Sequence, residues 1–359
     1  MKNAVITVMF GVTLMTYGCG DHSDTHQKNQ DAANYAQHLR LDAQIADKAK
    51  KIFAPLEAVA ENPDNPITEE KVKLGKMLYF DKRLSKDGNI SCNSCHNLET
   101  GGVDNLPTSP GDNGGFGDRN SPTVFNAAFH TTQFWDGRMK DVEEQAGGPI
   151  LNPVEMAIPS KEFLVERLGA VDLYQEMFAA AYPESSRPIS YWNIQQAIAA
   201  FERTLVTPTR FDDYLKGESK ALTLKEKEGL KTFMESGCIT CHSGATLGGN
   251  SFQKFGLFKD YWHYTGSEHI DEGRFKVTNN EVDKYMFKVP SLRNVADTYP
   301  YFHDGSVEEL EEAVKIMAEI NANKRLSDEE VSSIMTFLEA LSGELPVEVT
   351  QSPKELADL

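Results

Sequence analysis

The chain has 359 residues, of which 40% are hydrophobic and 25% charged, and its formal net charge is −18. This composition is typical of a soluble globular protein with room for two domains of ordinary size. The acidic balance argues against nucleic acid as a partner and is compatible with a basic protein partner.

Residues 1–19 are predicted to be an export signal. Lys2 gives a positive start, and the apolar run over residues 4–15 is too short to span a bilayer comfortably. The segment ends T-Y-G-C-G, which resembles a bacterial lipoprotein signal with Cys19 as the lipidated residue; a plain signal peptide is the alternative. We therefore expect a periplasmic protein in which residues 20–47 form a polar tether and a lead-in helix.

Apolar spacing predicts a mainly α-helical fold, since no strand-like alternation stands out between residues 34 and 341. The run over residues 68–80 and the stripe Ile194, Ile198, Phe201 and Leu205 follow helical periods. Three capping boxes mark further helix starts. They are formed by Thr223 with Glu226, Ser306 with Glu309, and Ser327 with Glu330.

The sequence contains two copies of C-x-x-C-H, the attachment motif of c-type haem. Two thiols three residues apart lie on one face of a helical turn, where they can add to the two vinyl groups of one porphyrin, and the next histidine can bind the iron. The copies are Cys92, Cys95 and His96, and Cys238, Cys241 and His242.

A C-x-x-C pair can also be a redox dithiol or half of a zinc site. Two copies, each followed directly by histidine in a chain with an export signal, favour two covalently bound haem c groups. They use four of the five cysteines, and the fifth, Cys19, lies in the leader, so no pair remains for a structural disulfide.

A faint internal repeat supports two similar units. K-L-G-K-M-L-Y-F, residues 73–80, precedes the first motif, and K-E-G-L-K-T-F-M, residues 227–234, precedes the second. A proline-containing break over residues 206–211 sets the predicted boundary. We expect domains over residues 48–206 and 207–345, followed by a tail over residues 346–359. The longest irregular region, residues 97–120, follows the first motif and is expected to be functional.

Seven segments, found from about Lys48 to Ser342 and including the first haem motif, together resemble the bacterial dihaem cytochrome c peroxidases. They are S-C-N-S-C-H-N, G-G-V-D-N, R-N-S-P-T-V-F-N-A-A-F, Q-F-W-D-G-R, G-P-I-L-N-P-V-E-M, P-S-L-R-N-V and P-Y-F-H-D-G-S. The resemblance implies two cytochrome c-like helical domains that reduce hydrogen peroxide to water. It assigns the peroxide-binding haem to His96 and the electron-accepting haem to His242. The electron donor would be a small cytochrome c or cupredoxin.

By the same resemblance, three residues serve catalysis around the first haem. Glu155 matches the acid–base residue that takes the inner proton of peroxide and supplies one to the outer oxygen. Gln145 matches a second polar residue that can orient peroxide, and Trp135 matches the tryptophan between the two haems. Without the resemblance, the first two would be ordinary surface residues and Trp135 a core aromatic.

The resemblance also assigns Met317 as the sixth ligand of the second haem, where a thioether raises the reduction potential. Met317 shares a predicted helix face with Leu310 and Val314, so a core methionine is the alternative reading, and Met286 and Met335 are competitors.

A calcium ion between the domains is implied as well. Asn120, Thr298 and Pro300 match its ligands, and a side-chain oxygen with two carbonyls suits a hard cation. By themselves these are ordinary turn residues. Relatives are often homodimers, which makes a homodimer an expectation by analogy.

The chain departs from the family at one position. Many members have a histidine in the loop after the first motif, which caps the first iron until the enzyme is partly reduced. Here Asp112 stands at that position, and no histidine occurs between His96 and His130. Reductive activation is therefore not expected. His130 is the nearest substitute ligand, although its neighbours suggest a packing or propionate role.

Two other functions remain open. A dihaem oxidase, like the methylamine-utilisation enzyme that modifies a partner's tryptophan, would carry tyrosine where Met317 stands. A dihaem electron carrier would need six-coordinate irons, whereas the first haem has no expected sixth ligand, and a carrier has no use for an acid such as Glu155.

Overall fold

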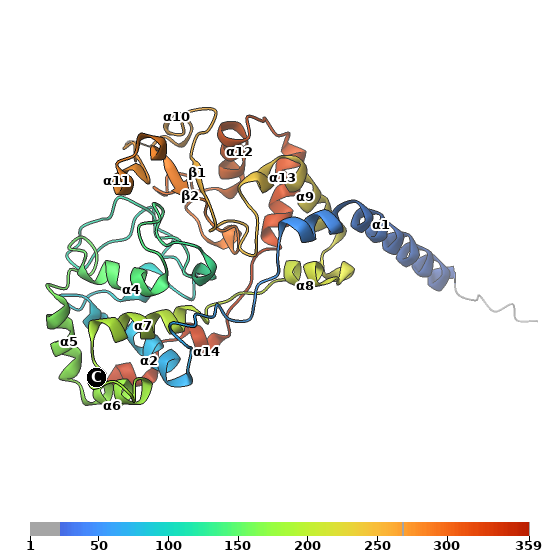
Figure 1. Cartoon of the computed structure of the whole chain (residues 1–359). Helices are drawn as coiled ribbons and strands as arrows, with labels where there is room; N and C mark the ends of the chain where they lie inside the picture. The colour runs from blue at the N-terminus through green and yellow to red at the C-terminus, as the bar shows by residue number, and fades with distance from the viewer. Residues whose placement is uncertain (1–21, 268, 359) are drawn as a thin grey trace, which may run out of the picture.

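The computed structural model describes residues 22–267 and 269–358, and it consists of two helical lobes with a long helix projecting from one of them (Figure 1). The predicted export signal and Cys19 lie outside the described residues. The helices are α1 (His22–Ile52), α2 (Glu69–Phe80), α3 (Cys92–Cys95), α4 (Val142–Leu151), α5 (Lys161–Gly169), α6 (Asp172–Ala181), α7 (Tyr191–Glu202), α8 (Arg210–Lys216), α9 (Leu224–Glu235), α10 (Trp262–Thr265), α11 (Phe275–Thr278), α12 (Leu310–Asn321), α13 (Asp328–Glu339) and α14 (Val347–Thr350). In the described residues no helix is long and apolar enough to cross a membrane.

The short 3-10 helices lie between these elements and at the C-terminal end. They are η1 (Lys82–Leu84), η2 (Ala127–Phe129), η3 (Ser219–Ala221), η4 (Cys238–Thr240), η5 (Glu281–Asp283), η6 (Val295–Asp297) and η7 (Lys354–Asp358). A two-stranded antiparallel sheet of β1 (Phe252–Lys254) and β2 (Met286–Lys288) pairs Gln253 with Phe287. It escaped prediction because three-residue strands are too short to show alternation.

The first core is built on the pairing of α2 with α7. Apolar side chains of both helices, such as Leu74 and Ile198, are fully buried in one cluster. The helices approach closely at Gly75, where an added Cβ would lie 1.9 Å from the carbonyl oxygen of Ala197. Glycine is required here because any side chain would separate the two backbones.

The second core repeats this arrangement with α9 and α13, which bury Leu230 and Phe337 in a separate cluster. An added Cβ at Gly229 would lie 2.2 Å from the carbonyl oxygen of Ser333. Gly75 and Gly229 occupy the same position in the two copies of the sequence repeat. The repeat therefore marks the helix that packs most closely against its neighbour in each lobe.

The two ends of the chain each pack on the other lobe. Ile45, Ala49 and Phe53 belong to the second core, so α1 is attached to the lobe that follows later in the sequence. Leu345 and Val349 pack against the first core, which places α14 beside α2 and α7 (Figure 1). These segments tie the two lobes together.

Most predicted helices are confirmed, and two local expectations are wrong. Thr68, Thr223 and Ser327 cap α2, α9 and α13, the last two in full capping boxes. Ser306 does not cap α12, because its backbone N–H and hydroxyl both donate to Asp304 and the helix begins at Leu310. The expected polar tether is already helical from His22, since the segment lacks proline and glycine.

Candidate active site

The first C-x-x-C-H motif forms a single turn of helix, α3, which begins with a reciprocal cap between Ser91 and Ser94. The backbone N–H of His96 donates to the carbonyl of Cys92 at 2.9 Å, which closes the turn. The hydroxyl of Tyr79 in α2 donates to the carbonyl of His96 at 2.6 Å, so the first core fixes the end of the motif.

Cys92, Cys95 and His96 all line one cavity of about 400 Å³. Two thiols and an imidazole opening into one enclosed space fit a covalently attached haem, with His96 available as a ligand. Burial raises the pKa of the Cys95 thiol to about 11 and raises that of Cys92 as well, which disfavours a reactive dithiol.

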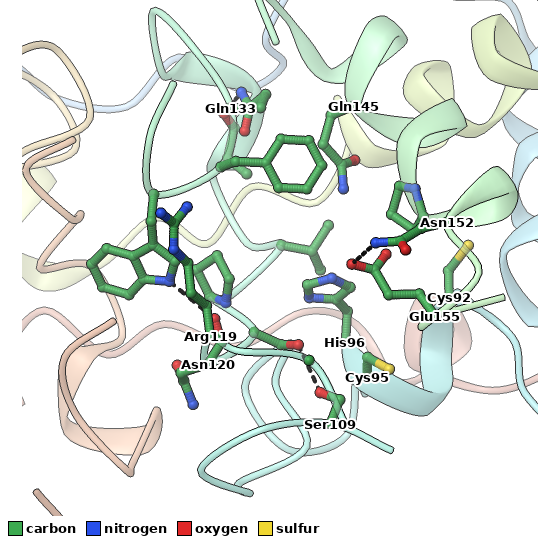
Figure 2. Close-up of a pocket in the computed structure, with 18 of the residues that line it drawn as sticks. Cys92, Cys95, His96, Ser109, Arg119, Asn120, Gln133, Gln145, Asn152 and Glu155 are labelled. Carbon is green, nitrogen blue, oxygen red and sulfur yellow. Dashed lines mark hydrogen bonds between the residues drawn. The ribbon is translucent and has the colours of Figure 1, made fainter. Parts of the chain in front are cut away.

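Two predicted residues face His96 across this cavity. Figure 2 shows the amide of Gln145, from α4, and the carboxylate of Glu155 directed toward the space above the imidazole of His96. Gln145 lies on α4, which ends at Leu151. The chain then turns back at residues 152–155, and this turn carries Glu155. The structure thus brings both residues to the cavity that holds the haem-attachment motif.

Asn152 fixes the orientation of Glu155. Its side-chain N–H donates to Glu155 Oε1 at 2.9 Å (Figure 2). The backbone carbonyl of Asn152 accepts the backbone N–H of Glu155 at 3.0 Å. Burial raises the pKa of Glu155, while Arg138 and the bond from Asn152 act in the opposite direction. The result is a carboxyl with one oriented oxygen and a pKa moved toward neutrality.

Asp112 does not line the cavity. Its carboxylate instead accepts the backbone N–H groups of Asp87 at 2.6 Å and Asn89 at 3.0 Å, just before the haem motif. Burial alone would raise its pKa, but these two N–H groups hold the pKa of Asp112 below its ordinary value. The backbone N–H of Asp112 also donates to the carbonyl of Glu155 at 2.8 Å, which attaches the loop to the acid's backbone.

The second motif lies in η4, after the closely packed helix α9. His242 is 8% exposed, and its Nδ1–H donates to the carbonyl of Leu247 at 2.9 Å. That bond places the ring proton on Nδ1 and leaves Nε2 unprotonated, an arrangement typical of metal-binding histidines. Burial raises the pKa of Cys238 to about 11 and that of Cys241 as well. This set also fits a covalent haem.

The three candidate methionines lie on different elements of the second lobe. Met317 is half-buried on α12, between the buried residues Ile316 and Ala318. Met335 packs against the second core from α13, and Met286 begins β2.

Trp135 lies where the two lobes meet. Its indole N–H donates to the carbonyl of Asn120 at 3.0 Å, and its own carbonyl accepts the N–H of Lys288 in β2 at 2.7 Å. Its ring is 6.4 Å, centroid to centroid, from the imidazole of His303 in the second lobe.

The loop that carries Asn120 contacts the segment with Thr298 and Pro300. The backbone N–H of Asn120 donates to the carbonyl of His303 at 2.8 Å, and the side chain of Asn105 donates to the carbonyl of Tyr299 at 2.9 Å. The side-chain N–H of Asn120 donates to the backbone carbonyl of Leu106, which leaves the side-chain oxygen of Asn120 for another partner.

Sequence reasoning missed several polar residues that line the cavity. Arg138 stacks over Phe134, with 3.4 Å between its guanidinium carbon and the ring centroid, and is held by Asp136. Glu202 is 6% exposed, and burial raises its pKa to about 8. Of the missed residues, only Asn152 had a local signal, because an Asn-Pro pair three residues before an acid is typical of a turn that returns on itself.

These features define a two-domain, mainly helical protein with two c-type haem sites, one of which opens on a cavity with a half-buried acid. The family model described as di-haem cytochrome c peroxidase matches residues 69–220, and the cytochrome c model matches residues 226–342. The chain is 47% identical to a cytochrome c551 peroxidase of Pseudomonas aeruginosa over 87% of its length and 90% of the relative's. It is 46% identical to a cytochrome c551 peroxidase of Nitrosomonas europaea, over 83% and 86%.

A solved structure agrees with these similarities. A MauG-like protein associated with microbial copper homeostasis has 31% sequence identity and a TM-score of 0.71, and the match covers 83% of this chain and 95% of that chain. The chain belongs to the dihaem cytochrome c peroxidase family.

Proposed function

We propose that this protein reduces hydrogen peroxide to water in the cavity above His96, with electrons from a small periplasmic redox protein. The observation that carries the proposal is the pair Glu155 and Gln145 facing the attachment motif across one cavity. A haem bound at this motif supplies the iron that binds peroxide and accepts electrons. The remaining chemistry belongs to the side chains.

Glu155 acts as the general base and then the general acid. Its carboxylate takes the proton from the inner oxygen of peroxide and returns it to the outer oxygen, so that the O–O bond breaks and the outer oxygen leaves as water. Two electrons from the donor and two protons from solvent convert the inner oxygen to the second water. Asn152 holds Oε1 at 2.9 Å, so Oε2 is the oxygen free for proton transfer. A pKa raised by burial suits this exchange, because the group must both accept and donate near neutral pH. The amide of Gln145 orients the peroxide by hydrogen bonding.

Cys238, Cys241 and His242 would hold the second haem, with Met317 as the proposed sixth ligand, and that haem would supply the site that accepts electrons from the donor. A thioether raises the potential of that haem, as an electron acceptor requires. Trp135 provides a packed path between the lobes, supported by its contacts to Asn120 on one side and Lys288 on the other.

The first haem needs no reductive activation. Asp112 stands where gated relatives have a histidine, and its carboxylate is bonded to two backbone N–H groups away from the cavity. Moving it to the iron would break both bonds and expose the charge to a less favourable site. His130 lines the cavity, but its Nδ1 atom accepts a hydrogen bond from Lys288. The ring proton therefore lies on Nε2, which disfavours His130 as an iron ligand.

The side-chain oxygen of Asn120 and the carbonyl oxygens of Thr298 and Pro300 would bind a calcium ion between the lobes. The free carbonyl oxygen of the Asn120 side chain and the contacts between the two segments support this site. Oxygen ligands of this kind suit calcium.

The mature protein is periplasmic, anchored through a lipid on Cys19, and its partner is a cytochrome c or a cupredoxin. The formal charge of −18 favours a donor with a basic surface. A homodimer is proposed by analogy with the family alone.

The dihaem oxidase remains the second candidate, because the solved relative is described as MauG-like. Met317, in place of the tyrosine expected of that oxidase, favours the peroxidase.

The test is turnover of hydrogen peroxide with an artificial one-electron donor. Wild-type protein should contain two covalent haems per chain in a pyridine haemochrome assay. The Glu155→Gln variant should keep both haems and lose about 10²–10⁴-fold in kcat/KM, because it cannot transfer the proton. Glu144→Gln is the matched control, since Glu144 lies beside Gln145 on α4 but does not line the cavity. A loss below tenfold for Glu155→Gln, or equal losses for both variants, would remove Glu155 from the mechanism.

A further inference from the structure

Two basic side chains in the wall of the first cavity have no role in the proposed chemistry. Lys288 is the last residue of β2, in the second lobe, yet it lines the cavity that contains His96. It is 7% exposed, and its Nζ donates to the carbonyl of Thr132 at 3.0 Å. His130, from the first lobe, lines the same cavity, and its Nδ1 lies 3.2 Å from Nζ of Lys288.

Lys288 is a buried cation that lacks an anion of its own. Burial lowers the pKa of Lys288 to about 8, and the negative charge of Asp136, which is not in contact with Nζ, offsets only part of this lowering. Asp136 is already paired with Arg119 at 2.7 Å and Arg138 at 3.0 Å. Among residues 22–267 and 269–358, no carboxylate lies within ion-pair distance of Nζ. A buried charge of this kind needs a partner of opposite charge to be stable.

His130 orients the ammonium of Lys288. The ammonium of Lys288 can only donate, so Nδ1 of His130 accepts and the ring proton lies on Nε2. Nε2 is buried and has no partner within the described chain. Burial, with the charge of Lys288, keeps the pKa of His130 well below its ordinary value, so the ring is neutral. The bond to Nδ1 fixes the position of the ammonium, whose remaining N–H donors select an anionic acceptor.

We propose that Lys288, oriented by His130, binds a propionate carboxylate of the first haem. This rests on the part of the proposed function that places a haem in this cavity. A haem is apolar except for its two propionates, so this unpaired cation specifies which edge of the ring lies at this wall. The carboxylate completes an ion pair with Lys288, whose ammonium is held in place by Nδ1 of His130.

The contact joins the first haem to the second lobe. The backbone N–H of Lys288 donates to the carbonyl of Trp135 at 2.7 Å, and the next residue, Val289, accepts the N–H of Gly249 at 2.7 Å. Gly249 follows the second haem motif, and an added Cβ there would lie 2.2 Å from the ring of His130. Lys288 is therefore a positioning residue. It holds the first haem against β2 and against the loop that follows the second haem motif.

The test compares Lys288→Met with Lys276→Met by spectroelectrochemical titration and resonance Raman spectroscopy of the purified dihaem protein. Lys276 lines the same cavity but is half-exposed and already paired with Asp271 at 3.1 Å, so it is the matched control. Loss of the Lys288 charge should make the first haem harder to reduce, lowering its ferrous-to-ferric ratio about tenfold at fixed potential. The propionate bending band of that haem should shift as well. Lys288→Arg should restore the potential, and the second haem should not change.

An unchanged potential and propionate band in Lys288→Met, or equal changes in the control, would overturn the assignment. If Lys288→Met does not accumulate with two haems, His130→Leu replaces it, and its propionate band must shift. A haemochrome assay showing no haem at Cys92 and Cys95 in wild-type protein would contradict the proposed function, separately from the role of Lys288.

Discussion

Two acids around the first cavity show how environment divides their roles. Glu155 is half-buried with one amide as its partner, and its pKa is raised; Asp112 receives two backbone N–H bonds, and its pKa is lowered. The raised pKa suits the proton exchange that we propose for Glu155, whereas the lowered pKa favours Asp112 as an anion that orders a loop. Their backbones are joined by a hydrogen bond of 2.8 Å, so the ordered loop supports the acid.

The sequence predicted these positions unevenly. Spacing alone identified the two haem sites, because C-x-x-C-H has a fixed geometry. Glu155 and Gln145 were found only through the resemblance, since P-V-E-M carries no chemical signal. Lys288 could not have been assigned from spacing, because its partner His130 lies on the other lobe and only the tertiary structure brings them to 3.2 Å.

Substitution of Met317 tests whether this residue is the sixth ligand of the second haem. Met317→His should lower the potential of that haem and leave the first unchanged, because imidazole favours ferric iron more than a thioether does. Redox titration followed by optical spectra measures both potentials. Met335→His is the control, since Met335 packs against the second core. If only the control shifts the second potential, the ligand is not Met317.

At the scale of elements, the two lobes use the same device. The copies of the sequence repeat place Gly75 and Gly229 where α2 meets α7 and α9 meets α13. The repeat was visible in the sequence, but its cause was not, because glycine in a helix gives no local sign of the backbone that approaches it. The failed cap at Ser306 has a similar origin: Asp304 competes for its hydroxyl and N–H.

Gly75→Ala and Gly229→Ala should each destabilise the protein by at least about 1–3 kcal/mol, the usual range for overpacking, because the new methyl group meets a carbonyl oxygen. Gly169→Ala is the control, since nothing lies within 4 Å of its added Cβ at the end of α5. Urea denaturation followed by circular dichroism gives the free energies of unfolding. Equal midpoints for all three variants would show that the close approach is not needed.

For the whole molecule, the exchange of chain ends is the feature that the sequence did not predict. The contacts of Ile45 with the second core and Val349 with the first are set by tertiary packing, and nothing in the local pattern indicates which lobe an amphipathic helix will cover.

A buried ion pair between Arg203 and Glu143, at 2.7 Å, stabilises the first lobe together with Asn62 and Asn65.

This pair predicts acid sensitivity. Burial would raise the pKa of Glu143, but hydrogen bonds from Arg203 and the two asparagines outweigh it and hold the pKa at about 2, against 4.5 ordinarily. The stabilisation, on the order of 3 kcal/mol, is complete above pH 4.5 and is lost as the pH falls toward 2. The difference in unfolding free energy between wild type and Glu143→Gln should therefore shrink over that interval in urea titrations. A difference independent of pH would contradict the lowered pKa.

The first site should be open to peroxide in the fully oxidised protein. The most direct measurement is stopped-flow mixing of the ferric protein, without reductant, with one equivalent of hydrogen peroxide. We predict a high-spin first haem before mixing and an immediate spectral change after it, because Asp112 is bonded away from the cavity. A low-spin first haem that reacts only after one electron has been added would contradict the account and would identify another residue as the cap.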